Sequence, residues 1–284
     1  MKHCRMMLYS GYISDEQLIS AVRNSDSLDN CYIGFYEKTW SHREHKNINH
    51  ELLKNISNYA KNAKVVHMTS KDLDVSGLEN PKDMEIRCRN HLLKIARDEN
   101  NDFLFLQDTD EFMKEEDYEF IKKNYIPEMT SAGFNCCAIR WITFWKNWNY
   151  AIVNEHGDSF QKTDDFLKSG YPLGWKHFIL NLNTPIFFSD WKKFGEIEHS
   201  IKSWILYDIF MYHGSWILTN EQVLEKIKTW GHSNEASEEE WKNWYEEKWL
   251  KWSPEMEEIS MKDKRLPVWK KATKYEGILP KECI

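Results

Sequence analysis

Two carboxylates separated by one residue, Asp108 and Asp110, directly follow the apolar run Asp102–Gln107. Carboxylate oxygens at this spacing can meet one hard divalent cation, which takes oxygen ligands and leaves positions open for phosphate oxygens. A solvated acidic turn is the alternative reading of such a pair taken alone. The apolar run is typical of a buried parallel strand, and ligands of α/β folds bind beyond the carboxyl ends of such strands. The pattern therefore predicts a metal site at Asp108 and Asp110.

The elements that must position this pair alternate in type along the first half of the chain. Apolar runs predict strands at residues 5–10, 31–36, 63–68 and 102–107, and apolar periodicity predicts helices at 47–62 and 81–98. A further helix begins after Ser14, with Gln17 at the capping-box position. Alternating strands and helices indicate an α/β fold with a mostly parallel, Rossmann-like sheet flanked by helices.

The second half is rich in aromatic residues. Strands are expected at 134–150, 177–188 and 204–218, and helices at 221–229 and 238–251. We therefore divide one continuous domain into a donor-binding half, 1–130, which includes Asp108 and Asp110, and an acceptor-side half, 131–284, with C-terminal helices.

Three segments carry a resemblance to a known family. They are the helix Met84–Asn90 followed by the strand that ends in Asp-Thr-Asp-Glu, the segment Tyr212–Trp216, and the segment Trp230–Glu235 after the next helix. Together they resemble the nucleotide-sugar glycosyltransferases of the GT-A fold, of the family-2-like type with a D-x-D motif. The resemblance implies a hexosyltransferase that uses a nucleotide-sugar donor.

The resemblance also implies a cofactor, Mn²⁺ or Mg²⁺, because the departing diphosphate must be neutralised. Asp110 would bind the metal directly, and Asp108 would bind the metal or the ribose of the donor. His213 is the candidate third ligand, since imidazole suits Mn²⁺ beside carboxylate and phosphate oxygens. The alternative for His213 is a hydrogen-bonded histidine in an aromatic core.

Donor binding involves further charged residues in this interpretation. Arg87 or Arg89 could pair with the diphosphate through two parallel hydrogen bonds. Either could instead form a helix-surface ion pair with Glu85 or Asp83. Glu111 would orient the site or bind an acceptor hydroxyl, or it is a plain loop acid.

A catalytic base is needed if the enzyme inverts the sugar, and none if it retains the configuration through another route. We expect Glu196, because Phe194–Glu196 reads as a loop from which a carboxylate can project. Asp208 is the second candidate, with a buried, hydrogen-bonded acid as its alternative.

Aromatic residues make up 14% of the chain, which suits binding to the flat apolar faces of sugars. Trp141, Trp145, Trp148 and Trp175 are the candidates for an acceptor groove. Core packing is the alternative for each of them.

Composition limits the class of protein. The net charge of −7 argues against the basic surface of most nucleic-acid binders. Six cysteines stand at 4, 31, 88, 136, 137 and 283 without a C-x-x-C pair, which predicts free, reduced thiols. Neither a signal peptide nor an apolar run of about 18 residues is present, so we expect a cytoplasmic protein.

The acceptor is left open at this stage. It is a saccharide on a glycan or lipid, or a sugar or hydroxymethylated base in DNA. The second option is kept because the Lys-, Asn- and Ile-rich composition is similar to that of T-even-type bacteriophage proteins, which glucosylate hydroxymethylcytosine. UDP-glucose is the default donor, on prevalence. The alternatives are a metal-dependent nucleotidyltransferase or phosphohydrolase, and a non-catalytic sugar-binding protein on a transferase scaffold.

Overall fold

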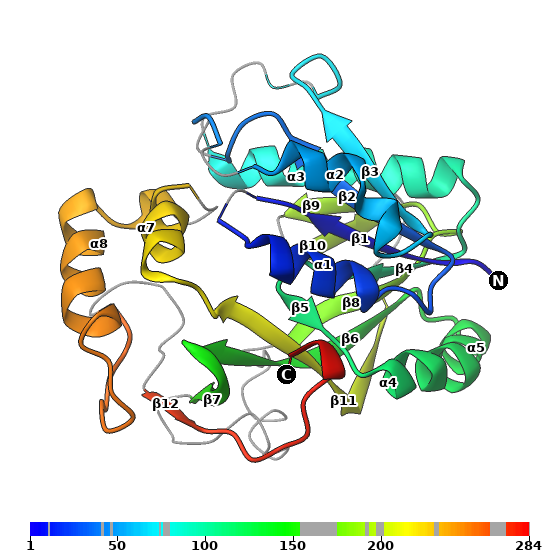
Figure 1. The fold of residues 1–284 in the computed structure, drawn as a ribbon. Helices are drawn as coiled ribbons and strands as arrows, with labels where there is room; N and C mark the ends of the chain where they lie inside the picture. Colours follow the sequence, from blue (N-terminus) through cyan, green and yellow to red (C-terminus); the bar gives the residue numbers. More distant parts are fainter. Residues whose placement is uncertain are drawn as a thin grey trace.

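The sheet that organises the molecule runs through both halves of the chain (Figure 1). The computed structural model describes residues 1–10, 12–40, 43–45, 48–73, 75, 80–153, 175–190, 193–196, 202–229, 233–261 and 271–283. In these residues ten strands form one sheet. Eight of them follow the order β12-β7-β6-β8-β4-β1-β2-β3, while β11 pairs with β6 and β5 pairs with β11.

The first half forms the parallel part of the sheet. Its strands are β1 (His3–Leu8), β2 (Asn30–Tyr36), β3 (Ala63–Met68) and β4 (Phe103–Leu106). All three pairings among them are parallel, in the order β3-β2-β1-β4. This is the order of a Rossmann-like half-sheet, in which the connections reverse direction between β1 and β4. The predicted α/β fold is confirmed.

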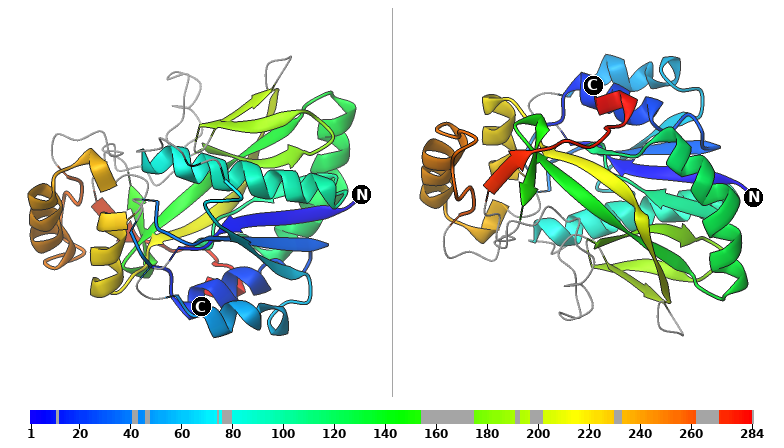
Figure 2. Two further views of the ribbon diagram at one scale, coloured as in Figure 1. Left: turned by 90° about the horizontal axis from the view of Figure 1, so that it is seen from above. Right: turned by 90° about the horizontal axis from the view of Figure 1, so that it is seen from below.

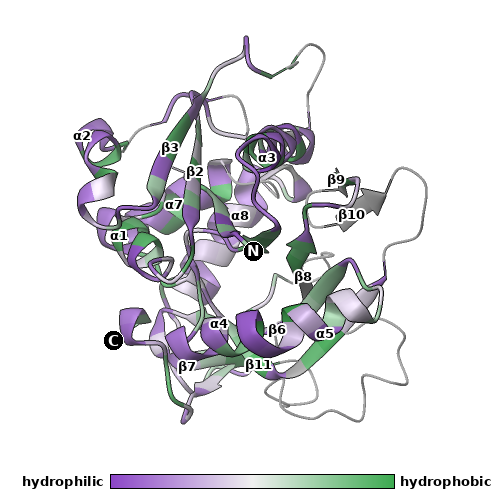
Figure 3. Cartoon of the chain, turned by 90° about the vertical axis from the view of Figure 1, so that its right-hand side faces the viewer, coloured by the Kyte–Doolittle hydropathy of each residue, from purple (hydrophilic) through white to green (hydrophobic). Residues whose placement is uncertain are grey.

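Both faces of this half-sheet are covered by helices, which explains why its central strands are buried and mainly apolar. On β1, Met6 packs in a cluster with α3 (Pro81–Asp98), whereas the next residue, Met7, packs with α1 (Asp15–Arg23). Figure 2 shows α3 and α1 on opposite sides of the strands, and in Figure 3 hydrophobic residues gather on the strands. Ser14 caps α1 and forms the predicted capping box with Gln17.

The rest of the sheet is mixed. The short β5 (Glu111–Phe112) pairs antiparallel with β11 (Ser203–Trp216), and β11 pairs parallel with β6 (Cys136–Trp145). The strands β7 (Asn147–Val153), β8 (Trp175–Asn181) and β12 (Lys271–Lys274) pair antiparallel with their neighbours. A separate hairpin joins β9 (Ile186–Asp190) and β10 (Lys193–Glu196). The strand expected at 134–150 is therefore a hairpin, which turns at Lys146 with a backbone φ of 65°.

The helices differ from expectation mainly in length. The helix expected at 47–62 is a short α2 (His50–Lys54) followed by a 3₁₀ turn, η1 (Ile56–Asn58). The helical segment α4 (Glu115–Phe120), η2 (Ile121–Tyr125) and α5 (Ile126–Ser131) was not predicted. No helix in the described ranges is long and apolar enough to cross a membrane.

The remaining helical elements lie near the carboxyl end of the chain. α7 (Asn220–Thr229) is followed by the 3₁₀ turn η3 (Ser233–Glu235) and by α8 (Glu238–Trp244), which continues into η4 (Tyr245–Trp249). Figure 1 shows α7 and α8 at the opposite end of the molecule from α4 and α5. A final 3₁₀ turn, η5 (Lys281–Cys283), contacts α1. All six cysteines are free and buried, as expected.

Candidate active site at the end of β4

The Asp-Thr-Asp-Glu segment forms a tight turn directly after β4. The Glu111 amide donates to the Asp108 carbonyl at 3.2 Å, and the Asp108 amide donates to Oε2 of Glu111 at 2.8 Å. β4 is the neighbour of β1, so the turn lies where the connections of the parallel strands reverse direction. This is the place in an open α/β sheet where ligands bind.

A buried arginine on β1 fixes the backbone of this turn. The Nη2 group of Arg5 donates to the carbonyls of Asp108 at 2.7 Å and Glu111 at 2.9 Å. Its Nη1 group donates to the Ala21 carbonyl at 2.7 Å and to Oγ of Ser25 at 3.1 Å. Arg5 is 0% exposed, so these bonds form away from water. It therefore ties the turn to β1 and α1, a role that no sequence pattern indicates.

Asp108 is held by a second buried arginine. Nη2 of Arg89 donates to both Asp108 carboxylate oxygens, at 2.9 and 3.1 Å, while Arg89 also contacts Glu85 at 2.7 Å. Arg89 is 3% exposed, and both carboxylates hold its pKa above the ordinary value despite burial. One of the two arginines suggested by the sequence is thus at the site, and Arg87 is exposed on α3.

Asp110 faces His213 on β11, a strand from the other half of the chain. Oδ2 of Asp110 lies 3.6 Å from Nε2 of His213, and both side chains are largely buried. Burial alone would raise the pKa of the Asp110 carboxyl, but His213 and Lys226 outweigh it and lower that pKa. The predicted juxtaposition of Asp110 and His213 is present in the structure.

The backbone of β11 is locked to the same turn. The Gly214 amide donates to the Asp110 carbonyl at 2.7 Å. A Cβ atom at Gly214 would lie 2.9 Å from the Trp148 ring, so only glycine allows this approach without a shift. Trp148 is itself fixed by edge-to-face contacts with Phe112 and Phe144.

A partly exposed aromatic surface adjoins His213. The Trp141 ring stacks on the imidazole with centroids 5.2 Å apart and an interplanar angle of 23°. Thr143, also partly exposed, lies opposite His213 in the parallel register of β6 and β11, and its hydroxyl is 3.4 Å from Nδ1. Of the four tryptophans suggested for an acceptor groove, Trp141 and Trp148 adjoin the site.

The other two tryptophans have different places. Trp145 is 0% exposed and packs among Trp216, Trp244 and Trp249, so the expectation that it lines an acceptor groove is wrong for this geometry. Its ring belongs to the core that attaches α7 and α8. Trp175 pairs with Arg140 across β8 and β6, and its side chain lies outside the described part of the structure.

The two candidate bases are not placed beside Asp110. Asp208 is exposed, in the irregular stretch of β11 between Leu206 and Phe210, five residues and so about 15 Å along the strand from His213. Glu196 pairs with Ile186 of β9. The Ile186 carbonyl accepts a hydrogen bond from Arg97 in the last turn of α3. Arg97 is about 12 Å along this helix from Arg89, the residue that binds Asp108, so the Glu196 backbone lies toward the other end of α3. The side chain of Glu196 is not among those that the structure describes.

The segment Trp230–Glu235, which carries part of the family resemblance, is described only from residue 233 onward.

Lys226 on α7 is a site residue that we did not predict. It is 1% exposed, and its ammonium donates to the carbonyl and the hydroxyl of Ser215 at 2.5 and 2.7 Å. Its positive charge helps His213 to lower the pKa of the Asp110 carboxyl. The sequence pattern could have identified this residue as a buried lysine. Lys226 stands on the apolar face of its helix, next to Ile227 and three residues after Val223.

Beside these groups, the carboxyl ends of β1 and β2 enclose a small cavity of about 10 Å³. Tyr12 and Trp40 are among the residues that line it. Burial and the nearby Asp110 raise the pKa of the Tyr12 hydroxyl, which stays protonated and able to donate a hydrogen bond. A ligand larger than one water molecule would therefore have to displace side chains here.

The chain was compared with known proteins. No protein-family model matches it, and no curated protein matches it. Among solved structures, S. aureus TarS superposes with a TM-score of 0.41 at 11% identity over 81% of this chain, which spans only 40% of the TarS chain. A crystal structure of TarS residues 1–349 gives 0.40 at 13% identity, covering 81% of this chain and 66% of that one. A CMP:2-keto-3-deoxy-manno-octonic acid synthetase complexed with CTP gives 0.32 at 9% identity, covering 64% of this chain and 75% of that one. Likenesses of this size identify neither a family nor an activity for the chain.

Proposed function

We propose that the chain is a metal-dependent glycosyltransferase that moves a sugar from a nucleoside-diphosphate sugar to an acceptor hydroxyl. The observation that carries this proposal is the pairing of Asp110 with His213 at the carboxyl end of β4. Their facing atoms are 3.6 Å apart, near the roughly 3 Å separation of two adjacent ligands on one octahedral ion. A carboxylate and an imidazole suit Mn²⁺, whereas Mg²⁺ prefers oxygen alone.

Donor phosphates would complete such a metal site. No group of three or more His, Cys, Asp or Glu side chains in the described part of the chain is arranged to hold a metal. An ion held by Asp110 and His213 would thus keep positions for water and for diphosphate oxygens, as metals in phosphate-transfer sites do. The ion would act as Lewis acid on the departing diphosphate.

Asp108 is better suited to the donor hydroxyls than to the metal. Both of its carboxylate oxygens already accept from Arg89, which neutralises the charge that a cation would need. The side chain is still 21% exposed and can accept a further hydrogen bond, so we assign it to a ribose or sugar hydroxyl.

The acceptor would lie against Trp141. This ring is partly exposed and stacks on His213, so an apolar face is available beside the proposed metal ligand. UDP-glucose as the donor, a glycan or DNA as the acceptor, a base at Glu196 or Asp208, and a cytoplasmic location stay predictions.

The test is the release of sugar from a panel of nucleotide sugars, measured with Mn²⁺ and with EDTA. We expect slow, metal-dependent hydrolysis of one donor, accelerated by its acceptor and reduced at least a hundredfold by Asp110→Asn. Asp98→Asn is the matched control, because Asp98 is an exposed aspartate at the far end of α3.

The other outcomes separate the alternatives. Turnover of nucleoside triphosphates or phosphate esters without a sugar would favour a nucleotidyltransferase or phosphohydrolase. Sugar binding that survives Asp110→Asn, with no turnover of any donor, would favour a non-catalytic scaffold. Hydrolysis that is unaffected by both EDTA and Asp110→Asn would contradict the proposed site.

A further inference from the structure

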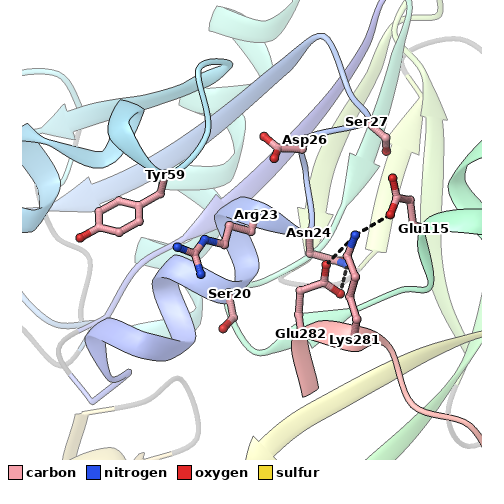
Figure 4. Close-up of a pocket in the computed structure, with 9 residues that line it drawn as sticks. All are labelled: Ser20, Arg23, Asn24, Asp26, Ser27, Tyr59, Glu115, Lys281 and Glu282. Carbon is pink, nitrogen blue, oxygen red and sulfur yellow. Dashed lines mark hydrogen bonds and ion pairs between the residues drawn. The ribbon is translucent and has the colours of Figure 1, made fainter. Parts of the chain in front are cut away.

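A pocket of about 500 Å³ lies beside α1, and Asp110 is not among the residues that line it (Figure 4). Its walls come from α1, the turn before β2, the start of α4, and η5 at the carboxyl end. The residues that line it are Ser20, Arg23, Asn24, Asp26, Ser27, Tyr59, Glu115, Lys281 and Glu282. Its volume lies within the range of small-molecule sites.

The lining mixes both signs of charge at close range. Lys281 contacts Glu115 at 2.5 Å and Glu282 at 3.9 Å, while Arg23 lies over the Tyr59 ring at 5.7 Å. An anion such as phosphate would meet the carboxylates, and a simple cation would meet Arg23 and Lys281. A neutral molecule with many hydroxyls would be repelled by neither set of charges. Each hydroxyl can donate a hydrogen bond to a carboxylate and accept one from a cationic side chain.

Tyr59 adds an aromatic ring to this polar lining. The ring is partly exposed, and apolar sugar faces pack on such rings. Hydroxyl-binding charged groups around one aromatic ring are the chemistry of a saccharide site.

The inner wall of the pocket is rigid. Asn24 is 5% exposed, and its amide group donates to Oε2 of Glu282 at 3.1 Å and to the Met113 carbonyl at 2.8 Å. Its carbonyl oxygen accepts from the Met113 amide and from the Tyr118 hydroxyl, both at 3.1 Å. Asn24 thus fixes Glu282, and with it η5, in the orientation that forms the pocket.

The same bonds lead toward the candidate active site. The Tyr118 hydroxyl also contacts the side-chain amide of Gln107, the buried residue that precedes Asp108. Buried hydrogen-bonded side chains therefore join the wall of the pocket to the Asp108 turn.

We propose that this pocket is a second binding site, specific for a neutral saccharide and separate from the site at Asp110. The proposal does not depend on the activity assigned to Asp110. It requires that substitutions in the pocket change the affinity for the saccharide and that a substitution of Asp110 does not.

The experiment is binding of the purified full chain to an array of neutral and acidic glycans. Affinities for the best neutral glycan are then measured by titration calorimetry. Arg23→Ala and Lys281→Met should each weaken that binding at least tenfold, because each removes a charged hydrogen-bond donor. Lys251→Met is the matched control, since Lys251 is also an exposed lysine paired with a glutamate, Glu247, and lies on a different surface.

Asp110→Asn should leave this binding within twofold of the unaltered protein, which separates the proposal from the proposed function. The inference is overturned if no neutral glycan binds, if only acidic glycans bind, or if Arg23→Ala and Lys281→Met bind as well as Lys251→Met. Circular dichroism of each variant checks that the fold is kept.

Discussion

Replacing Arg5 with lysine tests whether one buried guanidinium holds the candidate active site together. Arg5 donates four hydrogen bonds of 3.1 Å or less, two from each terminal nitrogen, to acceptors on opposite sides of it. A lysine ammonium donates from a single point, so it can serve the α1 side or the Asp108 turn but not both. Two buried acceptors then lose their donors, at about 1–3 kcal/mol each. We expect Arg5→Lys to lower the free energy of unfolding by about 2–6 kcal/mol.

Urea-induced unfolding followed by tryptophan fluorescence measures this change, because the buried tryptophan cluster reports on the core. Arg87→Lys is the control, since Arg87 is exposed on α3 and should change stability by less than about 0.5 kcal/mol. Nucleotide-sugar hydrolysis by the folded fraction of Arg5→Lys should also fall, as the turn loses its anchor. A loss below about 1 kcal/mol, or one equal to that of Arg87→Lys, would refute the role given to Arg5.

Three further changes test separate features. Gly214→Ala places a methyl group 2.9 Å from the Trp148 ring and should lower stability by about 1–3 kcal/mol in urea unfolding, and a neutral effect would show that the ring yields freely. Burial raises the pKa of Asp117 to about 6, so its ionisation destabilises the folded state as pH rises from about 4 to 6. Asp117→Asn should therefore raise the free energy of unfolding by on the order of 1–3 kcal/mol at pH 7–8 and leave it unchanged near pH 3.5. Unfolding curves recorded across this pH range measure the difference. Ser14→Ala removes the cap of α1 and should cost about 1 kcal/mol, measured by the shift of the thermal midpoint; no shift would mean that the capping box is not stabilising.

The parallel half of the fold was predictable because its signals are local. Strands buried on both faces are continuously apolar, so their positions could be predicted within two residues, and Asn80 and Pro81 mark the start of α3. The hairpin at Lys146 was not predictable, because a lysine with positive φ carries no turn signal and the aromatic run continues across it. The helical segment Glu115–Ser131 was missed, since its π-helical stretch breaks the regular 3.6-residue pattern.

The candidate site could likewise be predicted only in part. Asp108 and Asp110 could be identified because they follow a strand, and His213 because of the resemblance. The partners of these residues could not be identified, because they depend on which strands and helices become neighbours. Arg5 is an ordinary residue in a strand until β4 is placed beside β1, and Arg89 is one of two equivalent arginines until α3 is oriented against Asp108.

The charge around the turn predicts how a diphosphate must bind. Four carboxylates and three cationic side chains gather there: Glu85, Asp108, Asp110 and Glu111 with Arg5, Arg89 and Lys226. The formal charge of these seven side chains is −1, so they have no net positive charge to offer a dianionic diphosphate. A bound divalent ion changes that sum to +1 and makes the attraction favourable. We therefore expect titration calorimetry to show at least tenfold tighter binding of UDP, the nucleotide of the default donor, with Mn²⁺ than with EDTA. The Lys226→Met protein should bind more weakly than the unaltered protein in Mn²⁺, and equal affinity for UDP with Mn²⁺ and with EDTA would contradict the reasoning.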